Sequence, residues 1–117
     1  MFSIDNMSKI PVYEQLVKQI EKFILSGLLN VGDSLPSVRN LSVELSINPN
    51  TIQKSYSELT AKGITFSVPG KGLFISNEAI EIIENNRKAE IKETIKEMKL
   101  EGFSKKEILD IVVEVYK

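Results

Sequence analysis

The feature that most constrains this chain is a pair of short amphipathic segments separated by three turn-forming residues, 46–48. Asn48 is a favoured helix N-cap and Pro49 suits the first helical position, so the second segment has a well-marked start. Apolar residues recur at helical spacing on one face of each segment: Val38, Leu41 and Leu45 in the first, and Ile52, Tyr56 and Leu59 in the second. Two short helices joined by such a turn are typical of a helix-turn-helix.

The segments on either side complete a larger motif. A helix is predicted over residues 11–26, with Pro11 at its first position and Gly27 in the left-handed conformation that ends it. After Gly63 the apolar period changes to alternation, and two short runs, 64–68 and 73–75, flank a glycine-rich turn. A helix, a helix-turn-helix and a β-hairpin together predict a winged helix-turn-helix domain over residues 1–76.

Residues 77–117 predict two further helices, so the expected fold is mainly α with a small β-hairpin wing. The polar stretch 84–88 leaves open a break or a solvated stretch in the first of these helices. Ser104 and Glu107 have capping-box spacing in front of the second. Apolar residues cover more than half of the last helix, which favours a second copy of the chain as cover. The residues expected at a dimer interface are Ile91, Ile95, Ile108, Leu109, Val112, Val115 and Tyr116.

Composition excludes several functional classes. The 117 residues include no His and no Cys, which removes the commonest general base, thiol nucleophiles, disulfides and zinc clusters. We therefore predict no enzyme activity, no metal and no cofactor. No apolar run reaches the ~18–20 residues of a membrane helix, and the lack of Cys fits a reducing cytoplasm, where we expect the protein.

Charge gives only weak support for a polyanionic partner. Residues 1–76 carry seven Lys and Arg against six Asp and Glu, and residues 77–117 carry eight against ten. Residues 37–72 have a net charge of +2, less than the clearly basic face that is typical of a nucleic-acid binder.

The side chains at the start of the second short helix are more informative than net charge. Asn50 and Gln53 carry carboxamides that can pair with adenine edges, and Thr51 can bond a phosphate or contact a thymine methyl group. The hairpin tip, residues 70–72, combines a Lys with two glycines that let the backbone approach a minor groove closely. Double-stranded DNA is therefore the predicted partner.

Five collinear runs over about residues 10–76 resemble the DNA-binding domain of GntR-family transcriptional regulators: Pro11–Leu16, Gly32–Leu41, Asn48–Leu59, Lys62–Gly63 and Pro69–Phe74. The short helical tail resembles the YtrA-type subfamily. This resemblance implies a homodimer on a palindromic operator, with the tail as the dimer interface. It also implies that Arg39 reads a guanine or anchors a phosphate. It places Asn50, Thr51 and Gln53 in the major groove, Ser37, Asn48 and Lys54 on the DNA backbone, and Gly70 and Lys71 in the minor groove.

Two positions depart from the family pattern, and other interpretations stay open. Ser46 stands where Gly is frequent, which predicts strain if its φ is positive, and Leu73 stands where Thr is common. Arg39 and Lys71 also fit plain surface roles, and Asn48 is first of all an N-cap. The alternative function is a winged-helix protein-interaction module without DNA binding. The sequence identifies no effector, operator or regulated gene.

Overall fold

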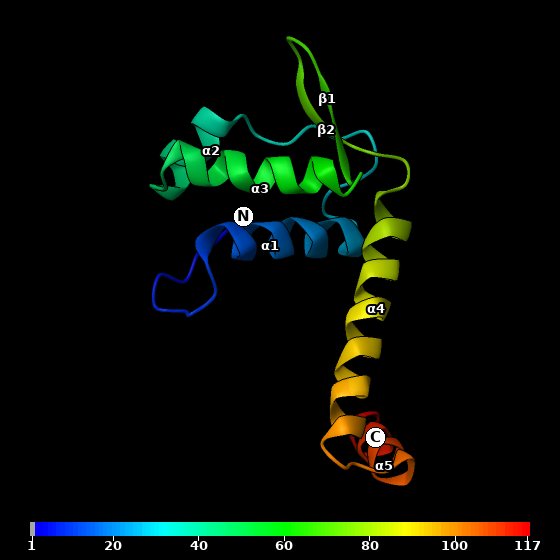
Figure 1. The fold of residues 1–117 in the computed structure, drawn as a ribbon. Helices are drawn as coiled ribbons and strands as arrows, with labels where there is room; N and C mark the ends of the chain where they lie inside the picture. Colours follow the sequence, from blue (N-terminus) through cyan, green and yellow to red (C-terminus); the bar gives the residue numbers. More distant parts are fainter. Residues whose placement is uncertain (1) are drawn as a thin grey trace. The chain divides into compact units, whose positions relative to one another are not determined.

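The computed structural model describes residues 2–117, which form five helices and one two-stranded antiparallel sheet (Figure 1). The predicted fold class, mainly helical with a β-hairpin wing, is confirmed. The chain divides into two compact units, residues 1–83 and 84–117, which are described separately below. The elements are α1 (Val12–Ser26), α2 (Val38–Leu45), α3 (Pro49–Ala61), β1 (Thr65–Val68), β2 (Gly72–Ile75), α4 (Ala79–Leu100) and α5 (Lys105–Val115).

Helices α1 and α3 lie side by side and form the centre of residues 1–83 (Figure 1). Gly27 ends α1 in the predicted left-handed conformation, with a φ of 83°. Pro11 is the N-cap and not the first helical residue, because its ψ of 145° is extended. The hydroxyl of Ser55 in the middle of α3 donates to the carbonyl oxygen of Tyr13 in the first turn of α1 at 2.8 Å, which ties the two helices together.

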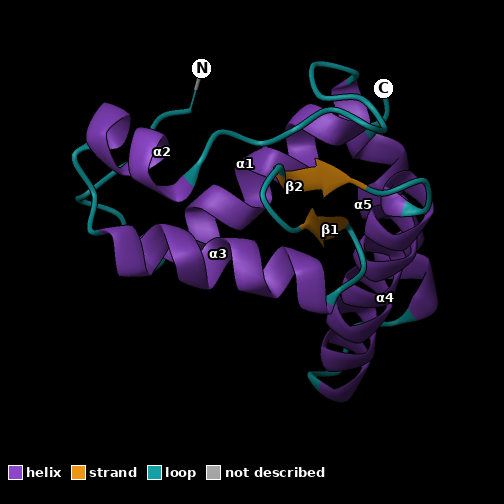
Figure 2. Ribbon diagram, turned by 90° about the horizontal axis from the view of Figure 1, so that it is seen from above, coloured by secondary structure: helices purple, strands orange, loops and turns teal. Residues whose placement is uncertain are grey.

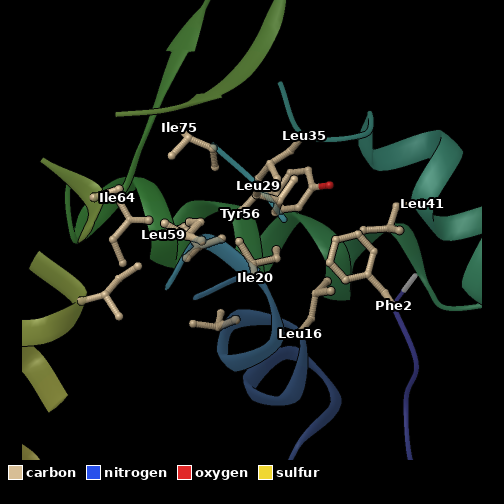
Figure 3. Packing of buried hydrophobic residues seen from close by; sticks show 14 of the residues in the cluster. Phe2, Leu16, Ile20, Leu29, Leu35, Leu41, Tyr56, Leu59, Ile64 and Ile75 are labelled. Carbon is tan, nitrogen blue, oxygen red and sulfur yellow. The ribbon is translucent and has the colours of Figure 1, made fainter. Parts of the chain in front are cut away.

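The core of residues 1–83 is built from the apolar faces predicted by helical spacing (Figure 3). Leu16 and Ile20 of α1 and Leu59 of α3 belong to this cluster, and all three side chains are fully buried. The hairpin closes this core through Ile64, which precedes β1, and Ile75 of β2, both fully buried. Burial of this kind stabilises a fold by about 1.5–3 kcal/mol for each large apolar side chain.

The two hairpin strands pair antiparallel (Figure 2). Phe66 lies opposite Phe74, and Ser67 lies opposite Leu73. Residues 32–35, for which the sequence predicted no strand, add a second row of backbone hydrogen bonds on the other edge of β2. The Leu35 N–H donates to the Leu73 carbonyl oxygen at 2.8 Å, and the Ile75 N–H donates to the Asp33 carbonyl oxygen at 2.9 Å. The base of the wing is therefore tied to the loop that leads into α2.

Residues 84–117 comprise most of α4 and all of α5. The polar stretch 84–88 lies within α4 without a break. The predicted capping box of α5 is confirmed: the Glu107 N–H donates to the Ser104 hydroxyl at 3.1 Å, and the Ser104 N–H donates to the Glu107 carboxylate at 3.0 Å. No side chain of residues 84–117 is buried in this unit. Within the described residues, no helix is both long enough and apolar enough to cross a bilayer.

Candidate nucleic-acid interface

Both helices of the helix-turn-helix begin with side-chain caps. The Ser37 hydroxyl accepts a hydrogen bond from the Asn40 N–H at 3.0 Å, and the Asn48 carboxamide oxygen accepts one from the Asn50 N–H at 2.8 Å. Between the helices, Ser46 has a φ of 54°, the only positive φ of a non-glycine residue in the described chain. The predicted N-cap at Asn48 is thus confirmed, and the φ of Ser46 is positive, the condition on which strain was predicted there.

The exposed face of α3 carries most of the side chains predicted to enter a major groove. Asn50 and Gln53 are exposed, whereas Thr51 is half-buried. Lys54, also exposed, places its ammonium 3.9 Å from the centre of the Tyr13 ring on α1, a cation–π contact. The side-chain amide of Gln53 donates to the Ser57 hydroxyl, four residues further along α3, at 3.1 Å.

A groove of about 710 Å³ lies between α3, the hairpin and the loop before α2, and we call it the α3–wing groove. Three predicted DNA-binding residues line it together: Ser37, Gln53 and Lys71. Its lining contains one cationic side chain and no carboxylate. The remaining lining residues are Ser34, Leu35, Pro36, Val38, Tyr56, Ser57, Thr60, Ala61, Ser67, Gly72 and Leu73.

The other predicted DNA-binding residues lie outside the lining of this groove. They are Arg39, Asn48, Asn50, Thr51, Lys54 and Gly70. Arg39 is exposed in the first turn of α2, so its guanidinium is accessible to a ligand. These residues nevertheless belong to the same compact unit as the groove. They lie near the starts of α2 and α3 and at the hairpin tip, the parts of a winged helix-turn-helix that contact DNA.

The hairpin tip is a tight glycine turn. Gly70 has a φ of 76°, and the Lys71 N–H donates to the Val68 carbonyl oxygen at 2.9 Å, which leaves the Lys71 side chain exposed. Leu73, which departs from the family pattern, is half-buried and packs against the core. At the position where a Thr hydroxyl is common in the family, this chain therefore has an apolar side chain that contributes to core packing.

Tyr56 anchors the floor of the α3–wing groove. Its hydroxyl donates to the Pro36 carbonyl oxygen at 2.7 Å, which ties α3 to the loop before α2. Burial, with a smaller contribution from the negative charge of Glu44, raises the pKa of the Tyr56 phenol well above its usual value. The phenol is therefore neutral and able to donate at any physiological pH.

Sequence reasoning missed four exposed hydroxyl residues of the α3–wing groove, Ser34, Ser57, Thr60 and Ser67. Ser57 lies four residues after Gln53, so helical spacing alone places both on one face of α3. Ser67 alternates with Phe66 on β1, and this period-two pattern could have assigned it to the face opposite the aromatic ring. The pairing of residues 32–35 with β2, by contrast, has no local signal.

The residues predicted for a dimer interface leave much apolar surface exposed within residues 84–117. Ile91 is 60% exposed, Val115 is 73% exposed and Tyr116 is 84% exposed, whereas Ile108 is half-buried. An apolar hollow of about 540 Å³ opens where α4 turns into α5. It is lined by Ile95, Lys99, Phe103, Ser104, Lys105, Ile108 and Leu109.

Comparison with known proteins gives consistent matches. Residues 12–75 match the family described as bacterial regulatory proteins, gntR family. The chain is 39% identical over 98 residues to the HTH-type transcriptional repressor YtrA of Bacillus subtilis (strain 168), which covers 84% of this chain and 75% of YtrA. A solved GntR family transcriptional regulator from Listeria monocytogenes superposes with a TM-score of 0.77 at 35% identity, over 95% of this chain and 98% of that one. The DNA-binding domain of AraR, solved in complex with operator ORE1, superposes with a TM-score of 0.55 at 26% identity, over 65% of this chain and 95% of that domain.

Proposed function

Because the chain belongs to the GntR family of bacterial regulatory proteins, we propose that it is a transcriptional repressor that binds a palindromic operator as a homodimer. The family assignment confirms the resemblance found in the sequence. The chain is a DNA-binding transcriptional regulator, and its relatives are named as regulators, not as enzymes. In this proposal it acts in the cytoplasm and represses by occupying promoter DNA, which requires no metal or cofactor.

The observation that carries this proposal is the polar, exposed face of α3 between two exposed cations, Arg39 on α2 and Lys71 on the wing. Asn50, Thr51 and Gln53 on this face would contact base edges in the major groove, and Arg39 would reach a guanine or a nearby phosphate. Lys71 would enter the minor groove with Gly70. The backbone contacts would come from Ser37, Asn48 and Lys54.

The near-neutral charge of residues 1–76 is compatible with DNA binding because three of the seven Lys and Arg side chains, those of Arg39, Lys54 and Lys71, lie on the elements of the proposed interface. Lys62, by contrast, lies 3.6 Å from the buried carboxylate of Glu21 and serves the fold. Arg39, Lys54 and Lys71 are all exposed on the elements that would meet DNA. Affinity in this arrangement depends on a small number of phosphate contacts, so its salt dependence should be moderate.

We assign residues 1–76 to DNA binding and residues 77–117 to dimerisation. The support for the second assignment is the apolar surface that residues 84–117 leave exposed, including Ile95, Leu109 and Val112. A second copy would cover this surface, and the two-fold symmetry of such a dimer would present two copies of α3 to a palindromic site.

DNA binding is tested by selection of duplexes from a random-sequence pool with the full-length protein, followed by anisotropy titrations at several salt concentrations. We expect an enriched palindrome, and we expect Lys71→Ala to reduce the slope of log affinity against log salt by about 1. Failure to enrich any duplex would overturn the proposal and favour a protein-interaction module. An unchanged slope in the variant would exclude the wing from phosphate contact.

Dimerisation is tested by analytical ultracentrifugation of Leu109→Asp beside the parent protein. A carboxylate in place of an interfacial apolar side chain should weaken the dimer by about 100-fold or more, because burial leaves the charge unsolvated. Thr94→Asp is the matched control, since it adds the same charge at an exposed hydroxyl residue of α4. A parent protein that sediments as a 13.2 kDa monomer at micromolar concentration would overturn the dimer.

A further inference from the structure

Six residues with a hydroxyl group line the α3–wing groove, and two of them, Tyr56 and Thr60, use it in contacts within the fold. Tyr56 donates to the Pro36 carbonyl oxygen, and the Thr60 hydroxyl lies 2.9 Å from the Thr65 hydroxyl. Both of these groups are occupied by contacts that hold the fold together. They are therefore poor candidates for contacts with a ligand in the groove.

The other four lining hydroxyls, those of Ser34, Ser37, Ser57 and Ser67, are exposed and still have a proton to donate, and Ser57 and Ser67 are the two that belong to α3 and to a strand of the wing. The Ser57 hydroxyl accepts a hydrogen bond from the Gln53 amide, so its own proton remains available. In the described chain the Ser67 hydroxyl makes no hydrogen bond, and both serines are exposed where they line the groove. Ser57 belongs to α3 and Ser67 to β1, so two free O–H donors reach the groove from two different elements.

The electrostatics of the α3–wing groove favour an anion. Lys71 is its only charged lining residue, and no carboxylate among the lining residues repels a negative group. Free hydroxyl donors beside a cation are the groups that contact phosphate oxygens in protein–DNA complexes, together with backbone N–H groups. The groove also runs along the element predicted to read bases, and it ends at the wing.

We propose that the α3–wing groove takes one sugar–phosphate strand of the operator, with Ser57 and Ser67 donating hydrogen bonds to its phosphates. This inference rests on the proposed function, because it requires operator DNA on this face. It adds two neutral donors to a domain whose net charge is small, so part of the backbone affinity is independent of cations. Binding through these hydroxyls does not release counterions and contributes nothing to the salt slope.

Ser57 has a second role in this arrangement, as a positioning residue for Gln53. A bidentate contact with adenine needs one N–H and the carbonyl oxygen of the Gln53 amide. The other N–H is the one bonded to Ser57 at 3.1 Å. With this bond in place, the amide plane is fixed before DNA arrives, which reduces the rotamer entropy lost on binding. Ser57 therefore has two roles in this proposal: it contacts a phosphate of the DNA backbone, and it orients the Gln53 amide that reads one base.

The test uses ethylation interference on the selected operator with the full-length protein and three variants: Ser57→Ala, Ser67→Ala and the double variant. Ethylation of a contacted phosphate removes a charge and adds bulk, so binding to that DNA molecule is lost. For the parent we expect interference at one or more phosphates beside the base pair read by Gln53. We expect each single variant to lose part of this interference and to bind about 2- to 10-fold more weakly, with an unchanged salt slope.

Ser26→Ala is the matched control, since Ser26 is an exposed serine at the end of α1, away from the groove lining. Thermal unfolding of each variant checks that the fold is kept. Parent-like interference in the double variant would overturn the phosphate contacts, although the operator would still be bound. Failure of the parent to select any duplex would instead overturn the proposed function, so the two failures are distinguishable.

Base preference separates the positioning role of Ser57 from a simple phosphate contact. At the base pair contacted by Gln53, the preference for A·T over G·C should fall by about 5-fold in Ser57→Ala, from loss of the oriented amide. In Ser67→Ala the preference should match the parent. Equal preference in Ser57→Ala and the parent would overturn the positioning role.

Discussion

Residues 1–83 and residues 84–117 place their apolar side chains in opposite environments. In the first unit Ile20, Leu59 and Ile75 are fully buried, and three helices and a hairpin supply the cover. In the second unit, α5 has no buried residue, and Leu100 is 88% exposed. The comparison teaches that helical periodicity predicts which side chains need cover but not where the cover comes from. One unit covers itself, and for the other we propose a second copy.

The largest expected effect is on the core of residues 1–83. Leu59→Ala removes a fully buried side chain and should lower the free energy of unfolding by about 2–5 kcal/mol, because it leaves a cavity between α1 and α3. The same truncation at Leu100, 88% exposed in its own unit, should change it by less than about 0.5 kcal/mol. Urea denaturation measures both. If both variants lowered the free energy of unfolding equally, the two units would not differ in how far they bury their apolar side chains.

The next effect separates binding from folding within residues 1–83. Arg39→Ala removes an exposed guanidinium and should weaken operator binding by about 1–3 kcal/mol, as for a lost base contact, while unfolding is unchanged. Fluorescence anisotropy with the selected operator measures the first quantity and urea denaturation the second. If the variant bound the operator as tightly as the parent, Arg39 would be a solvated surface residue with no contact to DNA.

A smaller effect concerns how α5 begins. Ser104→Ala removes the hydroxyl that accepts from the Glu107 N–H and should destabilise the first turn of α5 by about 1 kcal/mol, as for a lost N-cap. Carbon-13 chemical shifts of residues 105–115 report the change in helix content. If the chemical shifts of Ser104→Ala matched those of the parent, packing and not the capping box would maintain the first turn of α5.

The same cap predicts a pH dependence of α5. Hydrogen bonds from the Ser104 backbone, and then from its side chain, hold the pKa of Glu107 below its usual value. A lowered pKa in the folded state means that the stabilisation is present above the usual glutamate pKa and is lost as the pH falls through the folded value. Glu107→Gln should remove most of this acid-dependent fraying. A variant that frays with the parent's pH profile would assign the effect to another group.

The smallest expected effect is a gain. Ser46 has a φ of 54°, which is strained for a side chain with a Cβ atom, and glycine relieves this strain at the cost of a more flexible unfolded chain. Ser46→Gly should therefore stabilise residues 1–83 by about 0.5 kcal/mol, measured by thermal unfolding, and should leave residues 84–117 unchanged. A loss of stability would mean that the Ser46 side chain contributes more than its strain.

Local signals in the sequence predicted most elements and several of their details. Gly27 ends α1, Asn48 caps α3, and Ser104 and Glu107 form a capping box, because each of these structures depends on residues within one turn. The register of the hairpin follows from alternation and from the glycine turn at 69–72. Polar composition left open a break or a solvated stretch at residues 84–88, and the structure has the second, a largely exposed polar turn within a continuous α4.

The candidate site was predictable in its residue types but not in its grouping. Ser37, Gln53 and Lys71 come from three separate elements, and their common groove exists only because the loop before α2 pairs with β2. Lys54 was predicted to face DNA, yet its ammonium also lies over Tyr13 of α1, a contact between residues far apart in the chain. The pairing of distant segments has no periodic signature in a single sequence.

The amino-acid sequence by itself determined the helices, their caps, the hairpin turn and the polar face of α3, since propensity, capping and periodicity act within a few residues. Only the tertiary structure decided that residues 32–35 join the wing and that Ser57 and Ser67 line one groove. The physical reason is that these contacts depend on burial of a shared core, which many distant side chains specify together. No local pattern carries that information.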